Sequence, residues 1–220
     1  MTQRVTARPL IFVVALALVL NACVEGPRRP RAAPRPRVGR TYDPAQLRIC
    51  IGDLDRMVAR YALLPDRTFG GGCSALGSVQ LRDIGTPTAN LGAMTCPLAR
   101  AFTLWVQNDL AGPAQRSFAS RVVRIESFGT YSCRNVNGAA TGALSEHAFA
   151  NAVDVAAFVL ENGRRVTIKD GWNGGDDERE FLRAVRAAAC GRFQTVLSPD
   201  YNEAHHDHLH FDMGRGPFCR

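Results

Sequence analysis

The fold follows from two stretches of sequence: SEHAFANAVDVAAFV at residues 145–159 and HHDHLHFD at residues 205–212. Together they contain all five histidines of the chain. Asp154 is followed by an uninterrupted apolar run, which predicts a central strand that begins near this carboxylate. His147 is then expected on the short helix or loop before that strand.

The second stretch alternates polar and apolar residues. An extended strand therefore directs His208, His210 and Asp212 to one face and directs Leu209 and Phe211 to the core. This arrangement is what a metal site on a sheet requires, because neighbouring polar side chains converge on one side of the strand.

The histidines and Asp154 together indicate a zinc (Zn²⁺) site. A catalytic zinc ion takes three protein ligands from histidine nitrogens and carboxylate oxygens, and leaves a fourth position for the water that it activates. His147, Asp154 and His210 can supply those three ligands. Another divalent metal is the alternative. The cysteines do not suggest a zinc–thiolate site, because none of them has CxxC spacing.

The rest of the chain predicts one α+β domain over residues 41–220, in which a small antiparallel sheet carries the metal site, helices flank the sheet and disulfides staple the fold. Its first third is predicted to be mostly helical, from a cap at Asp43 through apolar positions that recur to Tyr61. The glycines at residues 70–72 should end that helical region. Further helices are predicted from Thr95, with a weaker continuation to Phe118, and over residues 177–189, and strands over residues 121–128 and 152–159.

The leader, residues 1–22, predicts a lipoprotein signal peptide. Arg4 and Arg8 precede an apolar run that is shorter than the about 20 residues needed to span a bilayer. The run ends at LNAC, which resembles a bacterial lipobox and implies cleavage before Cys23 and lipidation of that residue. An ordinary secretory signal is the alternative. Val24 is not acidic, which by resemblance indicates the outer membrane rather than the inner one and places the domain in the periplasm.

Cysteine usage agrees with export. The six cysteines other than Cys23 are an even set, which suits an oxidising compartment and predicts three disulfides without fixing their pairing. The six are Cys50, Cys73, Cys96, Cys133, Cys190 and Cys219.

The net charge of +7 lies outside the domain. Residues 1–23 contribute +2 and residues 24–40 contribute +5, so residues 41–220 are neutral. A neutral domain has no electrostatic footprint for nucleic acid, which we do not expect as a partner. The Pro/Arg-rich residues 23–40 predict a tether between the lipidated cysteine and the domain. Its arginines either contact anionic lipid headgroups or wall polymers, or form a solvated linker.

Several motifs resemble bacterial cell-wall proteins. The pattern from Ser145 to Asp154 is similar to the SxHxxGxAxD signature of the zinc D-Ala-D-Ala peptidases and related wall endopeptidases, with Ala150 where glycine is usual. HxH at residues 208–210 resembles their closing motif. Most of residues 48–220 resembles the bacterial extensin-like C-terminal domain family. The motifs that carry this resemblance are TCP at residues 95–97 with Trp105, GTYSCR at residues 129–134, LSEHA at residues 144–148 and HDHLH at residues 206–210.

The resemblance implies zinc on His147, Asp154 and His210, with His208 beside the activated water. It also implies that Arg134 binds a substrate carboxylate or the developing oxyanion through its planar guanidinium.

Two residues compete for the role of catalytic base. Asp207 lies three residues before His210, where some relatives place a glutamate base, whereas His208 occupies the HxH position used by others. If the strand continues through Asp207, that carboxylate points away from the metal, so alternation favours His208. Ser145 is expected either to support the ligands from outside or to cap the turn, and His205 to orient the histidine pair. His206 has the weakest case for a role.

Compartment and resemblance together imply a zinc metallopeptidase that hydrolyses peptidoglycan stem peptides. Cleavage of cross-links fits a membrane-tethered remodelling enzyme better than removal of a terminal D-Ala, although a D,D-carboxypeptidase is an alternative. A non-catalytic envelope lipoprotein that binds peptidoglycan or a protein partner is the alternative from another class. The sequence does not identify an activating protein.

Overall fold

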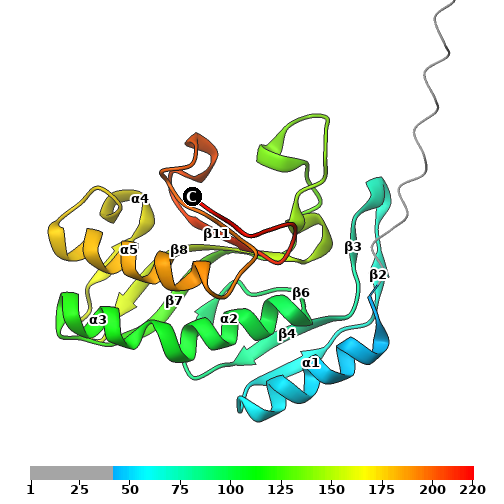
Figure 1. The fold of residues 1–220 in the computed structure, drawn as a ribbon, viewed down its shortest axis with the longest axis horizontal. Coiled ribbons are helices and arrows are strands. Elements are labelled where there is room, and N and C mark those ends of the chain that lie inside the picture. The colour runs from blue at the N-terminus through cyan, green and yellow to red at the C-terminus, as the bar shows by residue number, and fades with distance from the viewer. Residues whose placement is uncertain (1–41) are drawn as a thin grey trace, which may run out of the picture. The chain divides into compact units, whose positions relative to one another are not determined.

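The computed structural model describes residues 42–220 (Figure 1). The predicted signal peptide, the predicted lipidation of Cys23 and the predicted tether up to residue 40 lie outside the described residues. Within the described part, no helix combines the length and the apolar character needed to cross a membrane.

The described chain folds as one mixed α+β domain, which confirms the predicted fold class. Its helices are α1 (Pro44–Arg56), α2 (Cys96–Asp109), α3 (Ala111–Phe118), α4 (Ile168–Gly171) and α5 (Asp176–Cys190), with short 3₁₀ turns η1 (Gly70–Gly72), η2 (Val136–Gly138), η3 (Glu146–Phe149) and η4 (Glu203–His205). Its strands are β1 (Arg60–Leu63), β2 (Arg67–Thr68), β3 (Ser74–Ala75), β4 (Ser78–Asp83), β5 (Thr88–Ala89), β6 (Met94–Thr95), β7 (Val122–Gly129), β8 (Ala152–Leu160), β9 (Arg165–Thr167), β10 (Thr195–Leu197), β11 (Leu209–Asp212) and β12 (Phe218–Cys219).

A seven-stranded sheet forms the centre of the fold. Its order is β12-β10-β11-β8-β7-β5, and β9 pairs with β8. The pairs from β10 through β7 are antiparallel, whereas the outer pairs β10·β12 and β5·β7 are parallel. The sheet is therefore larger and more mixed than the small antiparallel sheet expected from the sequence. The reason is that β5 and β12 contain two residues each, too few to show a strand periodicity.

Helices α2 and α5 cover one face of this sheet, where the core lies, and α1 packs against α2 (Figure 1). The ring of Trp105 on α2 lies 6.1 Å from Phe158 on β8 and 5.1 Å from Phe211 on β11, measured between centroids. Phe181 on α5 lies 5.0 Å from Phe158. The Trp105 ring nitrogen donates to the backbone oxygen of Val185 at 3.0 Å, so its buried donor is satisfied. These contacts confirm that Phe211 faces the core.

Two of the three irregularities in the pairing of β7 with β8 determine which side chains face away from the core. Ala156 on β8 and Phe128 on β7 are extra residues without a partner in the ladder. Because side chains alternate along a strand, an extra residue reverses the faces that follow. The bulge at Ala156 lets Val155 and Phe158 both face the helices. Asp154 then faces the opposite side of the sheet.

The first third of the domain is not mostly helical, contrary to the prediction. Helix α1 ends at Arg56, and Tyr61, which was expected on the helix, lies in β1. Val58 has a left-handed backbone with φ of 58° where the chain leaves the helix. Strands β1 to β6 follow, and all of them except β4 contain four residues or fewer. Such short strands contain too few alternating positions to be distinguished from a helical pattern.

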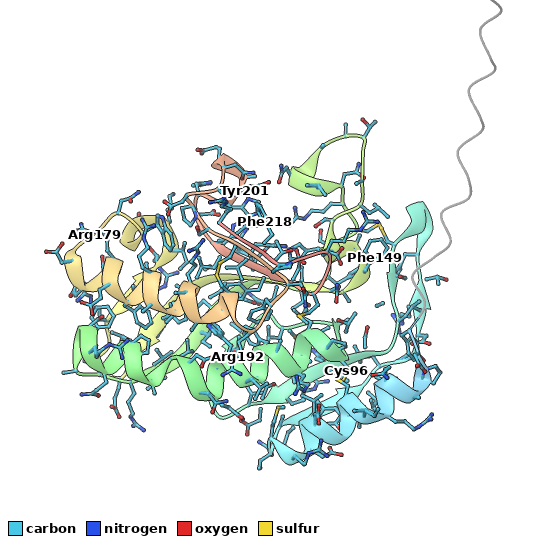
Figure 2. The ribbon with its side chains drawn as sticks, in the orientation of Figure 1. Cys96, Phe149, Arg179, Arg192, Tyr201 and Phe218 are labelled. Atoms are coloured by element: carbon cyan, nitrogen blue, oxygen red, sulfur yellow. A yellow bond between two sulfur atoms is a disulfide. The ribbon has the colours of Figure 1, made fainter. Side chains whose placement is uncertain are left out.

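Three disulfides staple the domain, as predicted, and the structure gives their pairing. Cys50 bonds Cys96, which joins α1 to the first residue of α2 (Figure 2). Cys73–Cys133 ties the residue before β3 to the segment that follows β7, and Cys190–Cys219 ties α5 to β12. Each bond restricts the unfolded chain, which stabilises a small exported domain.

Candidate metal centre

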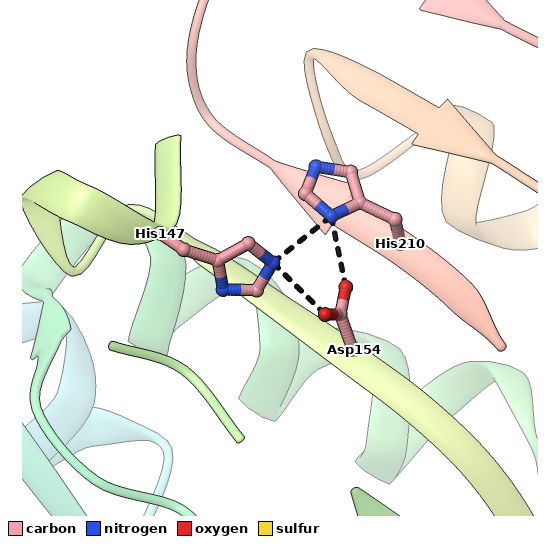
Figure 3. A group of neighbouring side chains, drawn as sticks. All are labelled: His147, Asp154 and His210. Carbon is pink, nitrogen blue, oxygen red and sulfur yellow. Dashed lines mark hydrogen bonds and ion pairs between the residues drawn. The ribbon is translucent and has the colours of Figure 1, made fainter. Parts of the chain in front are cut away.

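His147, Asp154 and His210 converge on the sheet face opposite the core (Figure 3). Nε2 of His147 lies 3.0 Å from one carboxylate oxygen of Asp154, and Nδ1 of His210 lies 2.9 Å from the other. The same two imidazole nitrogens are 3.2 Å apart. All three residues are buried. The three residues expected as ligands therefore form a group that could hold a metal ion.

His147 is held in place by its own turn. The residue lies in η3, and the Ser145 hydroxyl accepts a hydrogen bond from the His147 backbone N–H at 3.4 Å. Ser145 thus caps the turn, one of the two roles expected for it. The carbonyl of Thr130 lies 2.9 Å from Nδ1 of His147. Because a carbonyl only accepts, Nδ1 carries a proton, so Nε2 is the nitrogen that can give its lone pair to a metal ion when one binds.

Ala150 ends this turn in the left-handed region, with φ of 54°. Glycine adopts that conformation without the steric cost that a Cβ imposes. The backbone geometry therefore gives a physical reason for glycine at this position of the signature, and shows that alanine is accommodated here.

Asp154 and His210 are direct cross-strand neighbours on β8 and β11. On the far side of the His210 ring, Nε2 lies 2.9 Å from a carboxylate oxygen of Asp212. A carboxylate in this position typically orients a metal-ligating histidine. The sequence placed Asp212 on the same strand face as His210, but no role was predicted for it. Its position two residues after His210 was the signal that could have indicated a contact between the two side chains.

Two buried carboxylates flank His210 and control its protonation. Burial alone would lower the pKa of His210, but hydrogen bonds to Asp154 and Asp212 raise it to about 9. Burial alone would raise the pKa of Asp154, but hydrogen bonds from His147 and His210 hold it well below its usual range. His210 is therefore a cation in the metal-free protein at neutral pH, and a metal ion that binds its Nδ1 must displace that proton.

We expect the metal-free protein to lose stability as the pH rises from 6.5 towards 9. The pKa of His210 is raised from 6.5 to about 9 in the folded state. The stability that protonated His210 contributes to the folded protein is therefore complete below pH 6.5 and is lost as the pH rises through about 9. Urea denaturation in the presence of a chelator, repeated across this pH range, measures the effect. His210→Gln has no imidazole to titrate and should show a smaller decline, and an equal decline in both proteins would contradict the assignment.

His208 lies at the edge of the group. Its Nε2 is 3.5 Å from Asp154, and its Nδ1 is 2.8 Å from a carboxylate oxygen of Asp207. An ionised carboxylate only accepts, so Nδ1 donates and Nε2 retains a lone pair. That Nε2 is buried and has no hydrogen-bond partner among residues 42–220. An available basic nitrogen therefore faces the three candidate ligands.

Asp207 lies outside the strand that carries His210. Its carboxylate was expected to point away from the metal if the strand continued through it, but β11 begins at Leu209. Strand alternation therefore does not apply to Asp207. Its carboxylate instead holds the His208 ring and does not belong to the three-residue group.

The two remaining histidines differ in their surroundings. The ring of His205 packs 5.1 Å from that of His208 and 5.7 Å from that of His210, and its expected orienting role stays a prediction. Burial, and then the neighbouring His210 and His208, lower the pKa of His205 to about 4, so its ring is neutral. Asn202, which the sequence analysis missed, hydrogen-bonds its Nδ1 at 2.7 Å. His206 is exposed and donates to the backbone oxygen of Glu203.

The group opens into a cavity of about 310 Å³. Arg134 lines this cavity, with one guanidinium nitrogen 3.5 Å from Asp154 and its side chain 37% exposed. Phe128, the extra residue of the β7 bulge, is 59% exposed, and its ring lies 5.8 Å from that of His208. Phe128 could not be singled out from the sequence, because a bulge leaves no clear pattern in one sequence. Arg134 can thus contact both the group and a ligand in the cavity.

Comparison with known families covers most of the described chain. A family model described as Extensin-like protein C-terminus matches residues 48–220. That range includes His147, Asp154, His210 and every residue described here as lining their cavity. Comparison with curated proteins and with solved structures gives no significant match.

Proposed function

The chain belongs to the extensin-like protein C-terminus family, and we propose that it is a zinc-dependent hydrolase of amide bonds in peptidoglycan stem peptides. Within this class we favour a cross-link endopeptidase. The observation that supports the proposal most directly is the buried Nε2 of His208, which has no hydrogen-bond partner among the described residues and faces the three candidate ligands.

The donor set fits a catalytic zinc ion. Two imidazoles and one carboxylate are a typical ligand set for such an ion, and tetrahedral bonds of about 2.0–2.1 Å would place ligand atoms about 3.3 Å apart. The closest donor atoms here are 2.9 to 3.2 Å apart. The outer nitrogens of both imidazoles are held by Thr130 and Asp212. When bound, zinc would polarise the scissile carbonyl and lower the pKa of a water molecule to about 7.

The surrounding residues supply proton transfer and charge. His208 accepts a proton at Nε2 from the attacking water and then donates it to the leaving amine. Asp207 holds Nδ1 and stabilises the imidazolium that forms, so it is a positioning residue. Arg134 lies at the cavity wall, where its guanidinium can bind a substrate carboxylate or the developing oxyanion.

The location follows from the leader. Lipidation of Cys23 would anchor the protein to a membrane, with the outer membrane favoured, and residues 24–40 would tether the domain in the periplasm. Peptidoglycan is the polymer within reach of such a protein. The neutral charge of residues 41–220 argues against nucleic acid as a partner.

The test is to incubate the purified full-length protein with isolated peptidoglycan, with zinc and after chelation, and to identify the products by mass. We expect cross-linked fragments to be converted to monomers only when zinc is present. Release of D-Ala alone would instead indicate a D,D-carboxypeptidase. If folded, zinc-loaded protein gives no product, the hydrolase proposal fails and an envelope binding protein or a partner-activated protein becomes the better interpretation.

A further inference from the structure

A second cavity, of about 480 Å³, adjoins the one at the metal centre. Gly129, Thr130 and Tyr131 line both cavities. This segment leads out of β7, and the Thr130 carbonyl also holds His147. One short stretch of chain therefore forms a wall shared by the candidate metal centre and the second cavity.

The opposite wall comes from the hairpin of β2 and β3. Arg67 and Phe69 line the second cavity but Thr68 does not, which is the alternation expected of extended chain. The Phe69 ring lies 5.0 Å from the Tyr131 ring, so the Phe69 side chain faces the cavity. Arg67, two residues earlier, shares that face.

Arg67 is the charged residue among the described residues that line this cavity. Within residues 42–220 its guanidinium has neither a hydrogen bond nor an ion pair. The adjacent Asp66 carboxylate is directed elsewhere, since it accepts from the Tyr42 hydroxyl and the Gly77 backbone N–H and forms no ion pair with Arg67. The remaining lining is largely apolar or aromatic. A cation without an ion pair among residues 42–220 thus lies beside a largely apolar surface.

We propose that this second cavity, defined by Arg67, Phe69 and Tyr131, is a subsite for a carboxylate-bearing segment of the peptide substrate. Arg67 pairs with that carboxylate, and the two aromatic rings pack against the aliphatic part of the same segment. Because Arg134 lines the first cavity, an acidic peptide that crosses both cavities meets a cation in each. The assignment of the ligand as substrate rests on the proposed function, whereas binding of an acidic peptide does not.

The test measures binding without turnover. Soluble muropeptides, prepared from peptidoglycan with a muramidase, are titrated calorimetrically into the full-length protein in the presence of a chelator. A second set has its carboxylates converted to amides. Arg67→Glu should raise the Kd for the native set about tenfold or more, with little effect on the amidated set. Arg116→Glu makes the same charge change at an exposed position on α3 and should leave both values unchanged.

Arg67 is exposed, so its variants should fold, and Arg67→Lys should retain part of the affinity because it keeps the charge. An Arg67→Glu protein with the wild-type Kd for native muropeptides would overturn the subsite, as would failure of the wild type to bind them. The hydrolase proposal and the subsite proposal predict different results if they are wrong. If the hydrolase proposal is wrong, muropeptides bind in an Arg67-dependent manner but stay intact with zinc. If the subsite is wrong, zinc-loaded Arg67→Glu cleaves them with an unchanged KM.

Discussion

Asp154→Ala should remove tightly bound zinc and hydrolysis together. Asp154 contacts both His147 and His210 and is 6% exposed, so its loss removes the carboxylate of the three-residue group. Loss of residues that merely orient ligands lowers metal affinity about 10- to 100-fold, and loss of a ligand should exceed that range. Zinc content after dialysis, and Kd from competition with a chromophoric chelator, measure the change.

Two further variants distinguish the loss of a metal ligand from the loss of a residue near the ligands. Asp212→Asn alters the group behind His210 and should weaken zinc binding by about 10- to 100-fold, less than Asp154→Ala. His206→Ala removes an exposed imidazole that contacts Glu203 and Asp207, and should leave zinc content unchanged. Zinc retained at wild-type affinity by Asp154→Ala would refute the ligand assignment.

The parts of the fold that the sequence predicted are those with long, regular patterns. β7 and β8 were expected over residues 121–128 and 152–159 and occupy Val122–Gly129 and Ala152–Leu160. The alternation of HLHFD correctly placed His210 and Asp212 on one face and Phe211 in the core. The predicted convergence of the three candidate ligands followed from this periodicity together with the concentration of histidines.

The features that were missed depend on tertiary contacts or on the backbone. The Thr130 carbonyl that orients His147 has no signature, since every residue has such an oxygen. The bulges at Ala156 and Phe128 arise from the pairing of two strands, so the sequence of neither strand alone predicts them. Disulfide pairing likewise required the fold. The orientation of Asp207 could not be derived from the sequence, because it depends on the exact first residue of a strand, which local patterns locate poorly.

His208→Ala should lower kcat by about 10²- to 10⁴-fold, the usual contribution of general acid–base catalysis, while zinc content stays unchanged. The reason is that His208 supplies the buried nitrogen lacking a hydrogen-bond partner among the described residues, but is not one of the three candidate ligands. Steady-state cleavage of soluble cross-linked muropeptides, with zinc measured on the same samples, gives both values. Full activity in His208→Ala would exclude the role of base.

Asp207→Ala, compared with His208→Ala, distinguishes the two candidate bases, because the variant that lacks the base should lose more kcat. If Asp207 only positions His208 through its bond to Nδ1, its loss leaves the basic nitrogen present but less well oriented, and kcat should fall by about 10- to 100-fold. If Asp207 were itself the base, its loss would be the more damaging of the two. The same steady-state assay on both variants, with zinc measured on the same samples, compares the two losses of kcat. A larger loss in Asp207→Ala than in His208→Ala would contradict the positioning role.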